Sequence, residues 1–160
     1  MKKLFFTLLF GATLGTTVFA GPKSVATSDK NAAAIEKTVY TTDPTTLPTQ
    51  AQAFLRKHFS TLTVHQIKVE NEAEGREYDV KLAGGCEIDF DHRGEWTQVD
   101  CGRTAVPTSV LPERIARYVA DHYPRQFVVS IERDADKYEV ELSDKTDLEF
   151  ELRGDFLRID

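Results

Sequence analysis

The sequence predicts an α+β protein of two tandem repeats, each with one helix followed by an antiparallel β-meander of about four strands, and with the helices packed on one face of the sheet. The first observation behind this prediction is that the pattern of residues 47–100 recurs in residues 111–160, from an opening Leu-Pro pair to a closing pair of an aliphatic residue and Asp. The second is that the apolar spacing of each copy first fits a helix and then alternates as in a half-buried strand. The third is a glycine at the same place late in each copy, Gly94 and Gly154.

Each copy begins with a predicted helix, over about residues 49–58 and 112–122. Proline, present as Pro48 and Pro112, suits the start of a helix because its missing N–H would have no helical partner there. One stripe of each helix is apolar and is expected to face the sheet. The stripes are Ala51, Phe54, Leu55 and Phe59 in the first helix, and Ile115, Tyr118, Val119 and Tyr123 in the second.

Segments after each helix alternate between apolar and charged residues, which is typical of antiparallel strands with one buried face and one face in water. Gly94 and Gly154 stand where a short hairpin needs a positive φ. One copy alone is too small to bury much core, so the two copies are expected to share one. Joined edge to edge they would form one larger sheet, but the sequence leaves the mode of joining open.

The first 20 residues have the pattern of a secretory signal peptide. Lys2 and Lys3 form a short basic start, an apolar run follows, and Val18 and Ala20 supply the small residues of a cleavage site. A membrane anchor is the alternative, but the run is short and interrupted by glycine. We therefore expect a signal peptide over residues 1–20, a flexible linker over 21–35, a first repeat over 36–105 and a second over 106–160. The mature protein is expected to be periplasmic or secreted.

The mature chain is strongly acidic. Without Lys2 and Lys3 it has 18 Lys and Arg residues against 26 Asp and Glu residues, a net charge of −8. This charge argues against binding of nucleic acid or of anionic membrane surfaces. After cleavage no segment is long enough for stable membrane insertion.

Two cysteines, Cys86 and Cys101, flank one predicted hairpin. In an exported protein such a pair indicates a disulfide, which would staple the first repeat only. Closing a loop of this length stabilises the fold by about 3 kcal/mol in the chain-entropy model. A redox role is not favoured because the sequence has no Cys-x-x-Cys.

The tandem pattern resembles the PepSY-like family, which is described as similar to the β-lactamase inhibitory protein. It is carried by Leu47-Pro48, His58-Phe59, Tyr78-Asp79-Val80-Lys81-Leu82, Ile88-Asp89-Phe90-Asp91, Gly94-Glu95-Trp96 and Val99-Asp100, and again by Leu111-Pro112, His122-Tyr123-Pro124, Tyr138-Glu139-Val140-Glu141-Leu142 and Gly154-Asp155-Phe156. The resemblance implies an exported two-repeat α+β domain that binds a protein through the open face of its sheet. The single pair of cysteines departs from the inhibitor, in which both repeats carry a disulfide.

The alternation assigns many carboxylates to the face of the sheet away from the helices. Like charges that face each other across strands are mildly destabilising, so this surface is a candidate binding face for a basic protein or peptide of the cell envelope. The alternative is a solvated face that keeps the sheet soluble and discourages edge pairing. The candidate binding residues are Glu77, Asp79, Glu87, Asp89, Glu139, Glu141, Asp147, Glu149 and Glu151; Asp91 also belongs to the acidic pattern.

Trp96 and Phe156 are added to these candidates because they follow the hairpin glycines at equivalent places. Aromatic side chains are frequent anchors of interfaces. Packing in the core is the alternative interpretation.

Motifs for metal binding and catalysis are weak or absent. Asp89-x-Asp91 is faintly like a calcium loop, but Arg93 stands where an oxygen ligand is needed. The four histidines, His58, His65, His92 and His122, lack zinc-binding spacing. No nucleophile, metalloprotease, phosphate-binding or dinucleotide-binding motif is present. We therefore predict no metal, no cofactor and no enzymatic activity.

These observations predict an exported, non-enzymatic module that binds a protein or peptide through its acidic sheet face. One specific form would be an inhibitor of an envelope hydrolase or peptidase. The alternative is a periplasmic sensor, or a protein that binds a ligand or cation, without inhibitory activity.

Overall fold

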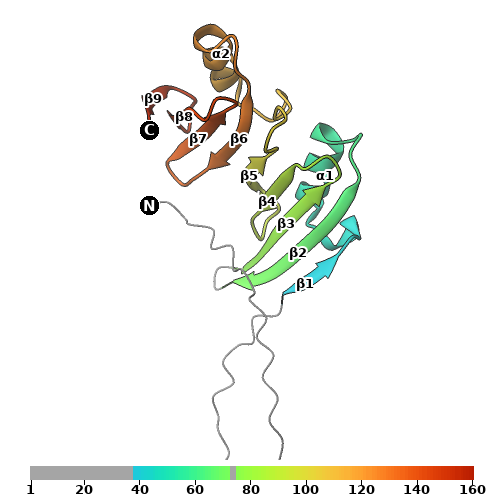
Figure 1. Ribbon diagram of the computed structural model, residues 1–160. Coiled ribbons are helices and arrows are strands. Elements are labelled where there is room, and N and C mark those ends of the chain that lie inside the picture. The colour runs from blue at the N-terminus through green and yellow to red at the C-terminus, as the bar shows by residue number, and fades with distance from the viewer. Residues whose placement is uncertain (1–37, 73–74) are drawn as a thin grey trace, which may run out of the picture. The chain divides into compact units, whose positions relative to one another are not determined.

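The structure, a computed structural model, describes residues 38–72 and 75–160 (Figure 1). The predicted signal peptide and linker lie outside the described residues. The described elements, in order, are β1 (Val39–Thr41), a 3-10 turn η1 (Pro44–Thr46), α1 (Thr49–His58), β2 (Val64–Glu72), β3 (Gly75–Leu82), β4 (Glu87–Phe90), β5 (Trp96–Asp100), α2 (Glu113–His122), β6 (Val128–Arg133), β7 (Lys137–Leu142), β8 (Asp147–Glu151) and β9 (Phe156–Ile159).

The described strands form a single antiparallel sheet of nine strands in the order β1 to β9. The predicted fold of two tandem helix-plus-meander repeats is therefore wrong. The chain is α+β with one large sheet and two α-helices in its described part. The physical reason lies at the centre, where β5 pairs directly with β6 through Gln98↔Glu132, Val99↔Ile131 and Asp100↔Ser130. This pairing removes two strand edges that separate units would leave unpaired. At one end β1 adds a further strand beside β2.

One face of the sheet carries the core. A row of aliphatic side chains crosses it in register from β2 to β8, and each is at most 1% exposed. The row consists of Ile67, Val80, Ile88, Val99, Ile131, Val140 and Leu148. Because side chains on a strand alternate between faces, the charged residues beside these positions lie on the other face.

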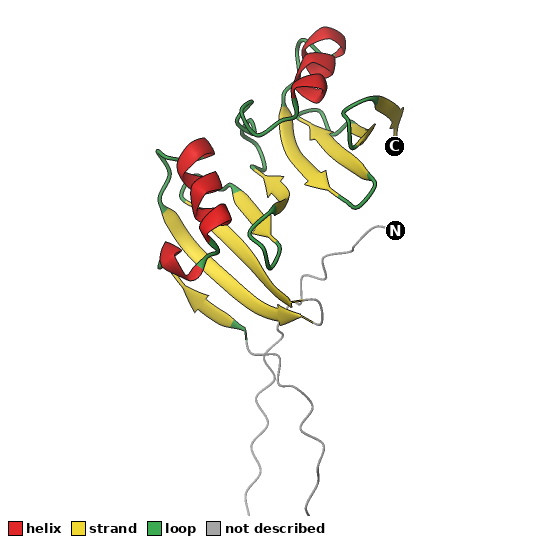
Figure 2. Ribbon diagram, turned by 180° about the vertical axis from the view of Figure 1, so that it is seen from behind, coloured by secondary structure: helices red, strands yellow, loops and turns green. Residues whose placement is uncertain are grey.

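Both helices cover this core face (Figure 2). Phe54 of α1 contacts Phe90 edge-on, with ring centroids 5.7 Å apart. Tyr118 of α2 contacts Phe150 in the same way at 5.3 Å. Phe90 and Phe150 lie two residues from core residues of their own strands, so α1 and α2 lie on the same face of the sheet.

The hairpin glycines hold two of the turns against the helices. Gly94 and Gly154 have φ values of 84° and 88°. A Cβ atom at Gly94 would lie 2.7 Å from the Cβ of Pro48, and one at Gly154 would lie 2.8 Å from the Cβ of Arg114. Glycine is therefore required at these turns for two reasons, the positive φ and the close approach of a helix.

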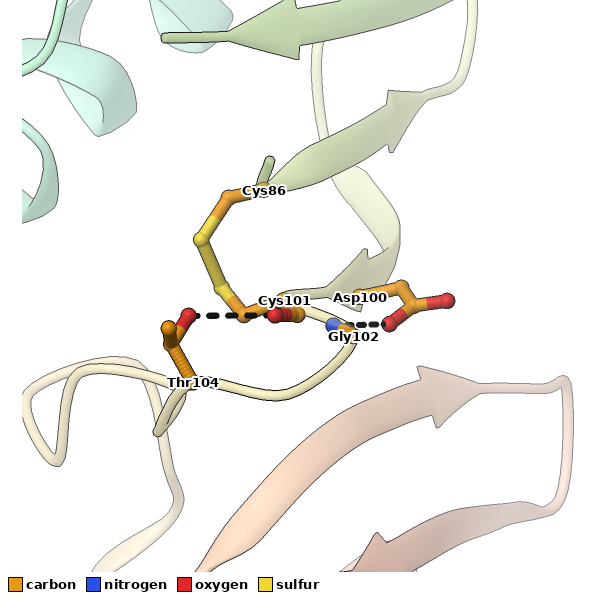
Figure 3. The surroundings of a disulfide bond; sticks show 5 residues. All are labelled: Cys86, Asp100, Cys101, Gly102 and Thr104. Atoms are coloured by element: carbon orange, nitrogen blue, oxygen red, sulfur yellow. Dashed lines mark hydrogen bonds between the residues drawn. A yellow bond between two sulfur atoms is a disulfide. The ribbon is translucent and has the colours of Figure 1, made fainter. Parts of the chain in front are cut away.

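The predicted disulfide between Cys86 and Cys101 is confirmed (Figure 3). The two cysteines lie just before β4 and just after β5, next to the aligned pair Glu87↔Asp100. The turn after Cys101 is closed by the side chain of Asp100, which accepts a hydrogen bond from the N–H of Gly102 at 2.7 Å. The disulfide thus anchors the end of β5, the strand that joins the two halves of the sheet through its pairing with β6.

Candidate functional site

The face of the sheet opposite α1 and α2 is the candidate site, and we call it the front face. A row of polar side chains crosses it in register from β2 to β9: Lys68, Asp79, Asp89, Gln98, Glu132, Glu139, Glu149 and Arg158. A second row contains Lys81, Glu87, Asp100, Ser130, Glu141 and Asp147. Neither described helix packs on this face.

The strand registers place all nine carboxylates of the sequence-based binding set on the front face. Their alternation with core residues puts them there, including Glu77 beside Glu70 and Glu151 beside Lys137. Asp91 does not join them. It lies in the β4–β5 turn, where its Oδ1 accepts hydrogen bonds from the N–H groups of Arg93 and Glu95 at 2.9 and 2.8 Å.

A buried carboxylate organises the part of the front face formed by β7 to β9. Glu149 is only 5% exposed. Its Oε1 accepts hydrogen bonds from the Nζ of Lys137 at 2.7 Å and from a guanidinium nitrogen of Arg158 at 2.9 Å. Lys137 also pairs with Glu139. The hydrogen bond from Lys137 is the main cause that lowers the pKa of Glu149, and the bonds to both glutamates raise the pKa of Lys137.

Lys137 was not among the residues predicted for this face, although a signal for it was present in the sequence. Lys137 has the same alternation parity as Glu139 and Glu141, so it belongs to the same face. It bridges two glutamates that would otherwise repel each other across β7 and β8. The acidic character of this part is therefore largely compensated.

Other lysines compensate further carboxylates. Lys68 pairs with Glu70 at 2.7 Å and with Asp79 at 3.3 Å. Lys81 pairs with Glu87 at 2.8 Å. On β4, in the middle of the front row, a carboxylate is left without such a pair within the described residues.

Asp89 is this carboxylate. It lies between Asp79 on β3 and Gln98 on β5, and its side chain has no hydrogen bond or ion pair within the described residues. Burial, reinforced first by the charge of Asp79 and then by that of Glu87, raises the pKa of Asp89 to about 7. Because no cation of the described residues offsets this burial and repulsion, the ionised form of Asp89 is disfavoured.

Trp96 and Phe156 lie on the core face, away from the acidic residues. Trp96 is half-buried between Phe54 and Tyr138, with both ring centroids 6.2 Å away. Phe156 stacks on Tyr118 with centroids 4.6 Å apart, and it is 37% exposed. The structure therefore does not bring these two aromatic residues together with the front-face carboxylates.

Within residues 38–72 and 75–160, no group of three or more His, Cys, Asp or Glu side chains is arranged to hold a metal ion. His58 Nδ1 bonds to the hydroxyl of Ser109 at 2.8 Å, and His122 Nδ1 bonds to the carbonyl of Tyr118 at 2.9 Å. Among the described helices, none combines the length and the apolar character that crossing a bilayer requires.

Comparison with known proteins identifies a family that matches the chain. The family described as "Putative beta-lactamase-inhibitor-like, PepSY-like" matches residues 76–158. None of the curated proteins compared with the chain matches it.

Solved structures of Bacteroides proteins resemble the chain over most of its length. A "putative periplasmic protein of unknown function" from Bacteroides vulgatus is 36% identical, with a TM-score of 0.73, and the match covers 78% of this chain and 99% of that one. A second periplasmic protein from the same species is also 36% identical, with a TM-score of 0.71 and coverage of 80% and 98%. A protein from Bacteroides thetaiotaomicron, described as a "putative calcium-regulated periplasmic protein", is 40% identical, with a TM-score of 0.69 and coverage of 72% and 91%.

All three of these structures are described as periplasmic proteins, which confirms the predicted periplasmic location. The family match over residues 76–158 confirms the resemblance found in the sequence. The chain belongs to the PepSY-like family.

Proposed function

We propose that this protein is a non-enzymatic binding module of the periplasm that holds a basic protein segment or peptide on its front face. The observation that carries the proposal is Asp89, a partly buried carboxylate at the centre of an acidic row with no cation beside it among the described residues. Its neighbours Asp79 and Glu87 add negative charge at the same place.

A Lys or Arg side chain from a partner would supply the missing cation. A positive charge close to a carboxylate favours its ionised form, so binding would remove the electrostatic cost of ionised Asp89. Complementary charge would also speed association and orient the partner. The lysine-bridged part around Glu149 is less suited to this role because its carboxylates are already paired.

An inhibitor of an envelope hydrolase or peptidase is one specific form of this function. The description of the family as β-lactamase-inhibitor-like supports it. An inhibitor of this kind would use the front face to cover basic residues near the active site of its target.

The test is affinity capture from an envelope extract with immobilised residues 21–160. The variant Asp79→Asn/Asp89→Asn removes two charges from the front face. The control Asp134→Asn/Asp136→Asn removes two charges from the turn between β6 and β7, outside both rows of the front face. We expect the wild type and the control to enrich the same basic protein at low salt, and the front-face variant to lose it. Equal capture by all three proteins would contradict the proposal.

A second candidate is a periplasmic sensor or cation-binding protein. It is favoured by the relative described as calcium-regulated. The residues do not fit a calcium site, because Asp91 is engaged by the N–H groups of its own turn and no cluster of three ligands occurs in the described ranges. We therefore derive no calcium-dependent step. Calorimetric titration with calcium distinguishes the candidates, since micromolar uptake would support the sensor.

A further inference from the structure

The strand β9 is an open edge of the sheet. Within the described residues its one neighbouring strand is β8. Four large apolar side chains in and just before β9 are each more than a third exposed: Leu152, Phe156, Leu157 and Ile159. An edge of this kind is normally protected in soluble proteins, because its free N–H and C=O groups can pair with another strand.

The free backbone groups of β9 can be identified. The N–H of Asp160 donates to the carbonyl of Asp147 on β8 at 3.0 Å, and Ile159 is aligned with Leu148. Because successive residues of a strand direct their N–H and C=O groups to opposite edges, those of Ile159 point away from β8. Ile159 therefore offers both a donor and an acceptor to an added strand.

A hollow adjoins the beginning of this edge. It has a volume of about 230 Å³ and lies between α2 and the first residues of β9. The rings of Tyr118, His122 and Phe156 line it, and its charged lining residues are Arg114, Arg117, Asp121 and Asp155. A hollow beside an open strand can receive one side chain of a segment that pairs with the strand.

The charge next to this edge selects the partner. The side chain of Arg158 is 64% exposed, and its ion-pair partner among the described residues, Glu149, is shared with Lys137. A carboxylate on the added strand opposite Arg158 would complement a cation that is only partly compensated. A second copy of this chain is the competing occupant: two-fold pairing of Leu157 with Ile159 would place Arg158 opposite Arg158 of the other copy, whereas pairing centred on Ile159 would place it opposite Asp160.

We propose that β9 is a second interaction site, at which an extended segment of a partner protein adds a strand to the sheet, with an acidic residue opposite Arg158 and a large apolar side chain in the hollow beside α2. Backbone hydrogen bonds to the open edge supply affinity, and the hollow and Arg158 supply specificity. Arg158 belongs to the front row, but the outward backbone groups of Ile159 and the hollow do not, and Ile159→Pro changes none of the front-face carboxylates. Loss of either activity therefore leaves the other testable.

The probe is a fluorescent synthetic peptide with the sequence Ser-Phe-Thr-Val-Glu-Val-Thr-Ser, measured by anisotropy with residues 21–160. Ile159→Pro removes the outward N–H without removing a bond to β8. Its matched control is Ile159→Thr, which keeps that N–H. We expect Ile159→Pro to weaken binding about tenfold or more, and Ile159→Thr to stay within about threefold of the wild type.

Charge specificity is tested with a second peptide, in which Lys replaces the central Glu. We expect the wild type to bind it about tenfold more weakly, and Arg158→Gln to reduce that difference. Circular dichroism establishes that each variant is folded. Equal binding by the Ile159→Pro and Ile159→Thr variants, equal binding of the two peptides, or no binding at millimolar concentration would overturn the proposal. A dimer in sedimentation that competes with the peptide would also overturn it, because a second copy would then occupy the edge.

Discussion

Replacing Asp89 with Asn should stabilise the protein at neutral and alkaline pH. The pKa of Asp89 is about 7 in the folded protein against an ordinary value of 3.8, mainly because of burial and then because of Asp79. A difference of about three pH units corresponds to at most about 4 kcal/mol, at 1.36 kcal/mol per unit. Water still reaches the front face and screens part of this effect, so we expect about 1–2 kcal/mol. Asn keeps the shape of the side chain and sacrifices no hydrogen bond within the described residues.

The sign of the pH dependence follows from the raised pKa. The folded protein holds the proton of Asp89 more tightly than the unfolded chain does, so this group stabilises the fold most below pH 4. That contribution is lost as the pH rises towards 7. The difference between Asp89→Asn and the wild type should therefore be near zero at pH 3.5, grow between pH 4 and pH 7, and stay constant above that.

Urea denaturation of both proteins at pH 3.5, 5.5 and 8 measures this difference. Asp79→Asn is the informative comparison, since Asp79 has Lys68 as a partner and should gain less from neutralisation. If Asp89→Asn were equally stable or less stable than the wild type at pH 8, the electrostatic account of the front face would be refuted.

Three further changes test the fold. Glu149→Gln should destabilise the protein by about 2 kcal/mol at pH 7, because a buried carboxylate with two cations is lost, and the deficit in urea denaturation should shrink in acid. Gly94→Ala should cost about 3 kcal/mol and Gly102→Ala only about 1, since both glycines have a positive φ but only Gly94 meets a helix; equal thermal shifts would contradict the clash. Replacing both Cys86 and Cys101 with Ser should lower the unfolding free energy by about 3 kcal/mol, and an unchanged midpoint in denaturant would rule out that contribution.

The local features of the fold were predictable from the sequence. The first helix covers the expected residues 49–58, because its apolar stripe and the preceding Pro48 are local signals. The positive φ of Gly94 and the disulfide next to the same hairpin were predictable for the same reason. The pairing of β5 with β6 was not, since alternation assigns faces but does not select a neighbouring strand.

The sequence predicted which carboxylates lie on the candidate site, but not which of them are paired with a cation. Alternation placed Asp89 and Glu149 on one face, yet it treated them as equivalent. Their difference depends on Lys137 and Arg158, which reach Glu149 from two other strands, while no described cation reaches Asp89. Such contacts depend on register between strands, and periodicity along one strand contains no information about it.

The unbroken front row also defines a length. Tyr40 on β1 is aligned with Lys68 and extends the row by one strand, so that from Tyr40 to Arg158 on β9 it crosses eight strand-to-strand steps. At about 4.8 Å a step this is about 38 Å along the sheet, which an extended chain of about eleven residues would span. A partner segment that lies across the strands can thus meet Lys68 near one end, Asp89 in the middle and the Lys137–Glu149 pair near the other. Measuring the affinity of partner peptides shortened one residue at a time would show which peptide side chain contacts each of these three positions.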